Sequence, residues 1–119
     1  MVPGARAVRR CMVASAVTIG LLATATPASA VAVVRGDGVV WRPSSVSIAR
    51  GEAVRWRAVF RAHVVKSYGT NWSYNKPIAQ GESVRRVFNT NGRYRFFCTI
   101  HGFVSAGTCT GMCGKVRVG

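Results

Sequence analysis

The feature that most limits the fold of this chain is the regular alternation of apolar and polar residues after residue 30. From Val54 to Phe60 apolar residues recur at every second position, and Arg55 and Arg57 lie between them. Side chains of a β-strand point to opposite faces with this period of two, whereas a helix repeats about every 3.6 residues. Three more segments alternate in the same way, namely those containing Val46 and Ile48, Tyr94 to Cys98, and Val116 and Val118. We therefore expect strands with an apolar inner face and a largely basic outer face.

Residues typical of turns separate these segments. They are Gly36-Asp37-Gly38, Pro43-Ser44, Arg50-Gly51-Glu52, Gly81-Glu82 and Asn89-Thr90-Asn91-Gly92. Short strands at close spacing indicate an all-β sandwich or small barrel rather than a parallel sheet. The aromatic residues expected in its core are Trp41, Trp56, Phe88, Tyr94 and Phe96. The segment from Ser67 to Gln80 is predicted to be a longer irregular connection, and no helical pattern longer than a turn or two is present.

The first 30 residues have the pattern of a secretory signal peptide. Three arginines precede an apolar stretch from Cys11 to Ala25, and Ala28-Ser29-Ala30 is a small-residue cleavage signal. We expect residues 1–30 to be removed and residues 31–119 to form one domain outside the cytoplasm, secreted or held in the periplasm or cell envelope. Arg9-Arg10 leaves both the general and the twin-arginine export routes open.

The processed chain is strongly basic. Loss of the three leader arginines lowers the formal charge from +14 to +11, and the acidic residues are Asp37, Glu52 and Glu82. Such a charge favours anionic partners, whether an acidic redox protein, a membrane surface or a cell-wall polymer. The same basic residues can equally form the solvent-exposed outer face of a sheet, without a partner. Nucleic acid is not expected as a partner of an exported protein, and a monomer is expected.

Four residues along the chain have the side chains of a mononuclear copper site. They occur as His63, then Cys98 and His101 separated by two residues, then Met112. Thiolate and thioether sulfur favour Cu(I), imidazole suits both oxidation states, and a weak axial methionine helps to set the reduction potential. Cys98 shares a strand face with Tyr94 and Phe96, so its sulfur should point into the core, and the strand should end there. Four protein ligands leave no open position for a substrate, which predicts transfer of single electrons rather than enzymatic catalysis.

The cysteine count is consistent with this site but leaves an alternative. Of the three possible pairings among Cys98, Cys109 and Cys113, only Cys109–Cys113 leaves Cys98 free as a thiolate, and we predict that disulfide. The alternative is a structural zinc site of Cys98, His101, Cys109 and Cys113 in a domain that binds an anionic polymer such as nucleic acid. The export signal and the otherwise unused His63 oppose it.

The sequence resembles a known family over nearly all of residues 31–119. It is similar to small cupredoxins of the plastocyanin and amicyanin type. The matching segments are Trp41-Arg42-Pro43, Ser45 to Ile48, Arg50 to Trp56, Ala62 to Val65, Gly81 to Ser83, Gly92 to His101 and Gly111 to Val118. The resemblance implies a Greek-key β-sandwich with copper near one end, held by His63, Cys98, His101 and Met112. It also implies outer-sphere electron transfer through the exposed edge of His101.

The chain departs from the family pattern at two places. Ten residues, 102–111, separate His101 from Met112, where close relatives have only a few. Val64 follows the first histidine, where plastocyanins often have asparagine, so we expect a hydrogen bond near the cysteine sulfur to be missing. A copper carrier or resistance protein that uses the same four residues is the alternative function.

Overall fold

The computed structural model describes residues 30–119, so the predicted signal peptide lies outside the described residues. This part of the chain is built from strands and contains no helix. The strands are β1 (Val31–Asp37), β2 (Val40–Arg42), β3 (Ser45–Ile48), β4 (Ala53–Phe60), β5 (His63–Tyr68), β6 (Asn75–Ile78), β7 (Ser83–Val87), β8 (Gly92–Ser105) and β9 (Thr108–Val118). Accordingly, no described helix is long and apolar enough to cross a membrane. The prediction of an all-β domain is confirmed.

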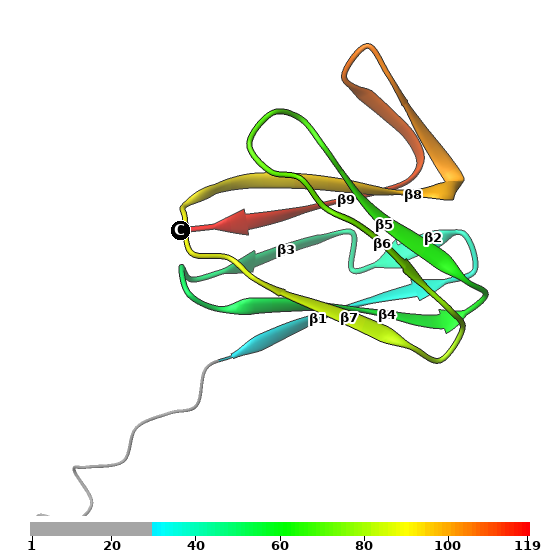
Figure 1. Cartoon of the computed structure of the whole chain (residues 1–119), viewed down its shortest axis with the longest axis horizontal. Coiled ribbons are helices and arrows are strands. Elements are labelled where there is room, and N and C mark those ends of the chain that lie inside the picture. The colour runs from blue at the N-terminus through cyan, green and yellow to red at the C-terminus, as the bar shows by residue number, and fades with distance from the viewer. Residues whose placement is uncertain (1–29) are drawn as a thin grey trace, which may run out of the picture.

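The strands form two mixed sheets packed face to face (Figure 1). The first sheet has the order β2-β1-β4-β7, and the second sheet has the order β3-β9-β8-β5-β6. Parallel pairing occurs between β1 and β4 and between β3 and β9, while the other neighbours are antiparallel. The C-terminal strand β9 therefore lies between β8, which precedes it in sequence, and β3, which is distant in sequence. This order is consistent with the predicted Greek-key sandwich.

The core lies between the sheets and follows the alternation in the sequence. On β4, Val54 and Trp56 are buried while Arg55 and Arg57 are exposed. The five aromatic residues expected in the core are all buried, and the ring of Trp56 meets that of Phe96 edge to face at 5.3 Å between centroids. Such edge contacts are a favoured geometry for aromatic rings. The predicted core is therefore confirmed at these positions.

Two predictions about the strands are corrected. The alternation placed Phe60 inside, but the register between β1 and β4 shifts after Gly36, and Phe60 pairs with the exposed Asp37. The extra residue of this bulge, Val59, turns Phe60 outward. The connection predicted to be irregular contains the edge strand β6, which pairs with β5. Its Pro77 lies on this edge strand, where a missing N–H is tolerated.

Candidate metal centre

Three of the predicted ligands lie together at one end of the sandwich. The possible donor atoms of His63, Cys98 and His101 are all within 4.8 Å of one another. The Cys98 Sγ is 3.8 Å from Nδ1 of His63 and 3.7 Å from Nδ1 of His101. Cys98 is 0% exposed and His63 is 1% exposed, whereas His101 is partly accessible. The group can therefore hold one metal ion that is shielded from water except on the His101 side.

A bulge in β8 brings Cys98 and His101 to the same point. Residues 98–101 of β8 are opposed by the single residue Met112 of β9. The pairs that flank this irregularity are Phe97 with Cys113 and Gly102 with Gly111. Four residues of β8 occupy the length that a single residue occupies on β9, so β8 bends sharply here. Cys98 and His101, which are three residues apart, can therefore face the same side. The prediction that the strand ends at Cys98 is wrong, because β8 continues through the bulge to Ser105.

Met112 is the β9 residue that faces this bulge. Its side chain is 0% exposed and belongs to the hydrophobic core cluster that also contains Cys98. Close contact between the strands depends on a glycine from each strand at the end of the bulge, where Gly102 pairs with Gly111. A Cβ on Gly102 would lie 2.8 Å from the backbone nitrogen of Met112, and one on Gly111 would lie 2.5 Å from the carbonyl oxygen of His101. The register thus places the thioether residue opposite the segment of β8 that carries Cys98 and His101.

The ten residues that separate His101 from Met112 form a β-hairpin. Ser105 pairs with Thr108, and Ala106 and Gly107 form the tip with positive φ angles of 52° and 78°. Two such residues are characteristic of the type I′ turns that close tight hairpins. Figure 1 shows the hairpin projecting away from the sandwich. The extra length is therefore accommodated outside the site.

The ring of His63 is held in one orientation by its surroundings. Its Nε2 donates a hydrogen bond to the Phe60 carbonyl oxygen at 2.8 Å, which leaves Nδ1 free on the side of Cys98. The Trp41 ring packs against it at a centroid distance of 5.5 Å. A carbonyl partner on the remote ring nitrogen fixes the tautomer and orientation of a metal-binding histidine. His63 is thus prepared to bind through Nδ1.

The sulfur of Cys98 receives a hydrogen bond from the neighbouring strand. The backbone N–H of Val64 donates to Sγ at 3.4 Å. This corrects the prediction, based on valine replacing asparagine, that a hydrogen bond near the sulfur would be missing. The donor is a backbone group, so it does not depend on the side chain at position 64. The donor helps to hold the sulfur in its position between the two imidazoles.

His101 lies at the surface between the buried ligands and solvent. Desolvation first, then electrostatic repulsion from His63 and Arg61, lowers the pKa of His101. The imidazole is therefore neutral near pH 7 and can donate a lone pair to a metal. Ile100 and Phe103, on either side of it in sequence, are exposed apolar residues. The segment that carries the accessible histidine therefore exposes apolar side chains as well.

The remaining two cysteines are joined to each other. Cys109 and Cys113 form a disulfide with a Cα–Cα distance of 6.1 Å, and Cys98 is the free cysteine among the described residues. Met112 lies within the short loop that this bridge closes. The zinc alternative is overturned at this point, because two of its three thiols are consumed by the disulfide.

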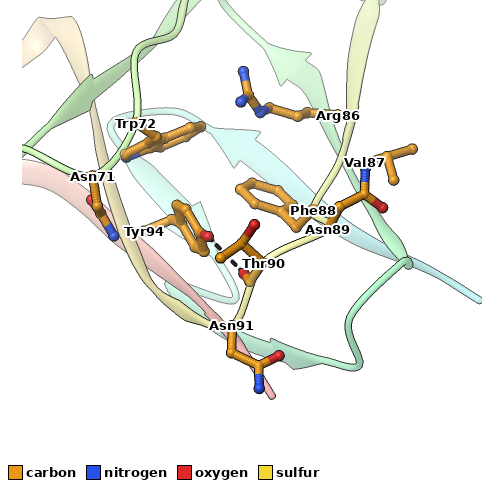
Figure 2. Close-up of a pocket in the computed structure, with 9 residues that line it drawn as sticks. All are labelled: Asn71, Trp72, Arg86, Val87, Phe88, Asn89, Thr90, Asn91 and Tyr94. Carbon is orange, nitrogen blue, oxygen red and sulfur yellow. Dashed lines mark hydrogen bonds between the residues drawn. The ribbon is translucent and has the colours of Figure 1, made fainter.

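A hollow near the beginning of β8 has no connection with this chemistry. It has a volume of about 340 Å³ and is lined on its aromatic side by Trp72, Phe88 and Tyr94 (Figure 2). The guanidinium of Arg86 lies over the rings of Trp72 and Phe88 at 5.5 and 5.8 Å. No histidine, cysteine or carboxylate lines it. This hollow is the polar margin of the aromatic core.

Comparison with known proteins adds evidence at the level of the fold. No protein-family model and no curated protein matches the sequence. Among solved structures, an amicyanin from Paracoccus versutus is similar with 25% identity and a TM-score of 0.57, covering 82% of this chain and 87% of that one. A purple cupredoxin from Nitrosopumilus maritimus has 20% identity and a TM-score of 0.57, covering 74% and 99%. This chain has the cupredoxin fold.

A larger enzyme contains the same cupredoxin fold. The Cu-containing nitrite reductase from Thermus scotoductus matches with 21% identity and a TM-score of 0.62 over 82% of this chain. This chain spans only 26% of that protein. The fold resemblance predicted from the sequence is therefore confirmed, and it does not by itself assign an activity.

Gly36 is a part of the candidate metal site that the sequence pattern does not predict. The sequence predicts a turn at Gly36, but this residue lies within β1, and a Cβ there would be 2.5 Å from Cδ2 of the His63 ring. Its position in an alternating segment, after Ala32 and Val34, was the available signal. Glycine inside a strand often marks the close approach of another group.

We expect Gly36→Ala to damage the metal site more than the fold. The added methyl group must displace the His63 ring or the strand, so metal affinity should fall by about 10- to 100-fold, as it does when the support of a ligand is removed. Isothermal titration of the protein with metal measures this loss.

Val34→Ala is the matched control on the same strand and inner face. Val34 is fully buried, so truncating it should lower the free energy of unfolding by about 1–3 kcal/mol while leaving metal affinity unchanged. Equal affinity in Gly36→Ala and the unmodified protein would contradict the role assigned to Gly36.

Proposed function

We propose that this protein binds one copper ion through His63, Cys98, His101 and Met112 and carries single electrons between redox partners outside the cytoplasm. The observation that carries the proposal is the buried Cys98 sulfur flanked by two imidazole Nδ1 atoms at 3.7 and 3.8 Å. One thiolate and two imidazoles form the equatorial set of blue-copper electron-transfer sites. Copper bound there would supply a one-electron couple.

The surroundings of the ligands support electron transfer in particular. His63 is oriented by the Phe60 carbonyl, and the Cys98 sulfur accepts the Val64 N–H. Both ligands are fully buried, so water has little access to the site. Fixed ligands in a dry pocket change their positions little when charge is gained or lost, which favours rapid transfer.

Met112 is the proposed weak fourth ligand. It faces the bulge that contains Cys98 and His101, and it is fully buried in the same core cluster. No other sulfur of the described residues is available, since Cys109 and Cys113 are joined in the disulfide. A thioether at this point would tune the potential without replacing the three stronger donors.

His101 is the proposed point of electron entry and exit. It is the accessible member of the group, and exposed Ile100 and Phe103 lie near it in sequence. Exposed apolar side chains next to this histidine in sequence suit brief contact with a redox protein, since little polar surface must lose water. Acidic groups around the partner's contact surface would be attracted by the positive charge of this protein.

A copper carrier remains the alternative function, and the geometry favours it less. An acceptor protein would have to reach ligands that are 0% and 1% exposed, through the side of His101 alone. Hand-over of metal ordinarily needs accessible thiols that can exchange between partners. The fixed orientation of His63 also opposes stepwise release.

Copper titration followed by voltammetry tests the proposed function. We expect one equivalent of Cu(II) to produce an intense visible absorption, and we expect repeated reduction and oxidation to leave the metal in place. A colourless copper complex would contradict the site. Loss of copper on reduction, or its rapid transfer to an apo-protein, would instead favour the carrier.

A further inference from the structure

The outer surface of the first sheet carries a block of arginines that the metal site does not use. We call it the arginine face; it consists of Arg35, Arg42, Arg55, Arg57 and Arg85, all exposed. These residues come from all four strands of the sheet, β2, β1, β4 and β7. The alternation that buries Trp56 and Val54 places the arginines together on the opposite side.

The strand register sets these charges directly against one another. Arg35 is paired with Arg42 on one neighbouring strand and with Arg57 on the other, and Arg55 is paired with Arg85. Like charges at directly opposed positions of a sheet are destabilising. The arrangement therefore has a cost in the isolated domain that an anionic partner would remove.

Carboxylates of the described residues do little to neutralise the arginine face. Asp37 approaches Arg42 at 3.9 Å, with both side chains largely exposed, and an ion pair of this kind contributes little. Glu52 and Glu82 accept hydrogen bonds from backbone N–H groups in their own turns. The positive charge is thus free to act on a partner.

Exposed valines lie among these arginines. Val31, Val33 and Val87 are 36%, 40% and 41% exposed, and Val33 is paired with Arg55 on the same face. A surface that combines cations with apolar side chains matches the boundary of a bilayer, where anionic headgroups adjoin acyl chains. A soluble acidic polymer would use the arginines but gain nothing from the valines.

The shape of the molecule makes this side available to an extended surface. The β8–β9 hairpin projects from the second sheet, away from the side on which β1, β4 and β7 lie (Figure 1). The metal group lies at the end of the sandwich, where His63 packs beside Gly36 and Trp41. A domain resting on its first sheet would therefore keep His101 free to meet a soluble partner.

We infer that the arginine face docks this protein on a membrane surface rich in anionic phospholipid. This inference does not depend on the proposed copper chemistry, because the arginine face contains none of the four ligands. Contact of the guanidinium groups with lipid phosphates supplies the attraction, and the valines enter the headgroup boundary. The protein would then move along the membrane while its metal end remains accessible.

Binding of residues 31–119, the predicted processed form, to vesicles tests this docking. The variant Arg35→Gln, Arg55→Gln, Arg57→Gln, Arg85→Gln should bind mixed phosphatidylglycerol–phosphatidylcholine vesicles more than about a hundredfold less tightly, since each arginine near such a surface contributes about fivefold. Co-sedimentation at low salt measures the loss. Vesicles of pure phosphatidylcholine should bind neither protein.

The matched control removes the same charge from the second sheet. Its substitutions are Arg93→Gln, Arg95→Gln, Lys115→Gln and Arg117→Gln, all at exposed positions. They should lower binding less than about fivefold, because their side of the sandwich lies beyond the screening length from a membrane on the first sheet. Equal losses in the two variants would show that net charge alone attracts the protein and would overturn the assigned face.

Two further arms complete the test. The double variant Val33→Ser, Val87→Ser leaves the charge unchanged and should weaken binding to vesicles severalfold. Unchanged binding would overturn the assignment of lipid as the partner. Stronger binding of the unmodified protein to soluble polyglutamate than to vesicles would also overturn it. The visible copper spectrum should be the same in all variants. A protein that binds vesicles but no copper would refute the proposed function and leave this docking intact.

Discussion

Replacing Cys98 with alanine is expected to abolish the intense visible absorption of the copper-loaded protein. The absorption would arise from a copper–thiolate bond, and Cys98, whose sulfur lies between the two imidazoles, would provide the thiolate. Copper affinity should also fall by more than about a hundredfold, which exceeds the effect of losing a supporting contact. Absorption spectroscopy and competition with a copper chelator measure the two effects.

The two disulfide cysteines provide the matched control for this experiment. The double variant Cys109→Ser, Cys113→Ser should keep the visible absorption, because neither residue belongs to the metal group. It should lose about 2 kcal/mol of unfolding free energy, as expected for a bridge that closes so short a loop. Retention of the absorption in Cys98→Ala would show that another residue provides the thiolate and would refute the site.

The buried side of the sandwich could be predicted from the sequence because one physical signal determines it. Val54, Trp56 and Ala58, with arginines between them, can share one buried face only if the chain is extended. That His63, Cys98 and His101 lie together could be predicted for a related reason. Thiol and imidazole groups in this order have few roles in common except metal binding, so their meeting in space follows from their chemistry.

Features that depend on how two strands meet could not be predicted in this way. The bulge that places four residues of β8 opposite Met112 results from the register on either side of it, which the spacing of residues 102–111 does not reveal. The outward turn of Phe60 has the same origin in the β1–β4 register. The Val64 N–H donor is a backbone group, and the direction of a backbone N–H cannot be inferred from the identity of the side chain at that position.

Substitution of Met112 tests whether its sulfur contacts copper, and two variants should move the reduction potential in opposite directions. Met112→Leu keeps the apolar volume but removes the donor, so it destabilises the more highly charged Cu(II) and should raise the potential. Met112→Gln offers an amide oxygen, a harder donor that favours Cu(II), and should lower it. Each shift should exceed about 60 mV, which corresponds to a tenfold change in the relative affinity for the two oxidation states.

The opposite signs separate coordination from packing. Met112 is fully buried beside Cys98, so any substitution disturbs the core and lowers stability. A disturbance of packing alone has no reason to raise the potential with leucine and lower it with glutamine. Val116→Ala, at another buried position of β9, should reduce the unfolding free energy by about 1–3 kcal/mol without moving the potential. Potentials that stay constant, or that move together in both Met112 variants, would show that copper is held by His63, Cys98 and His101 alone.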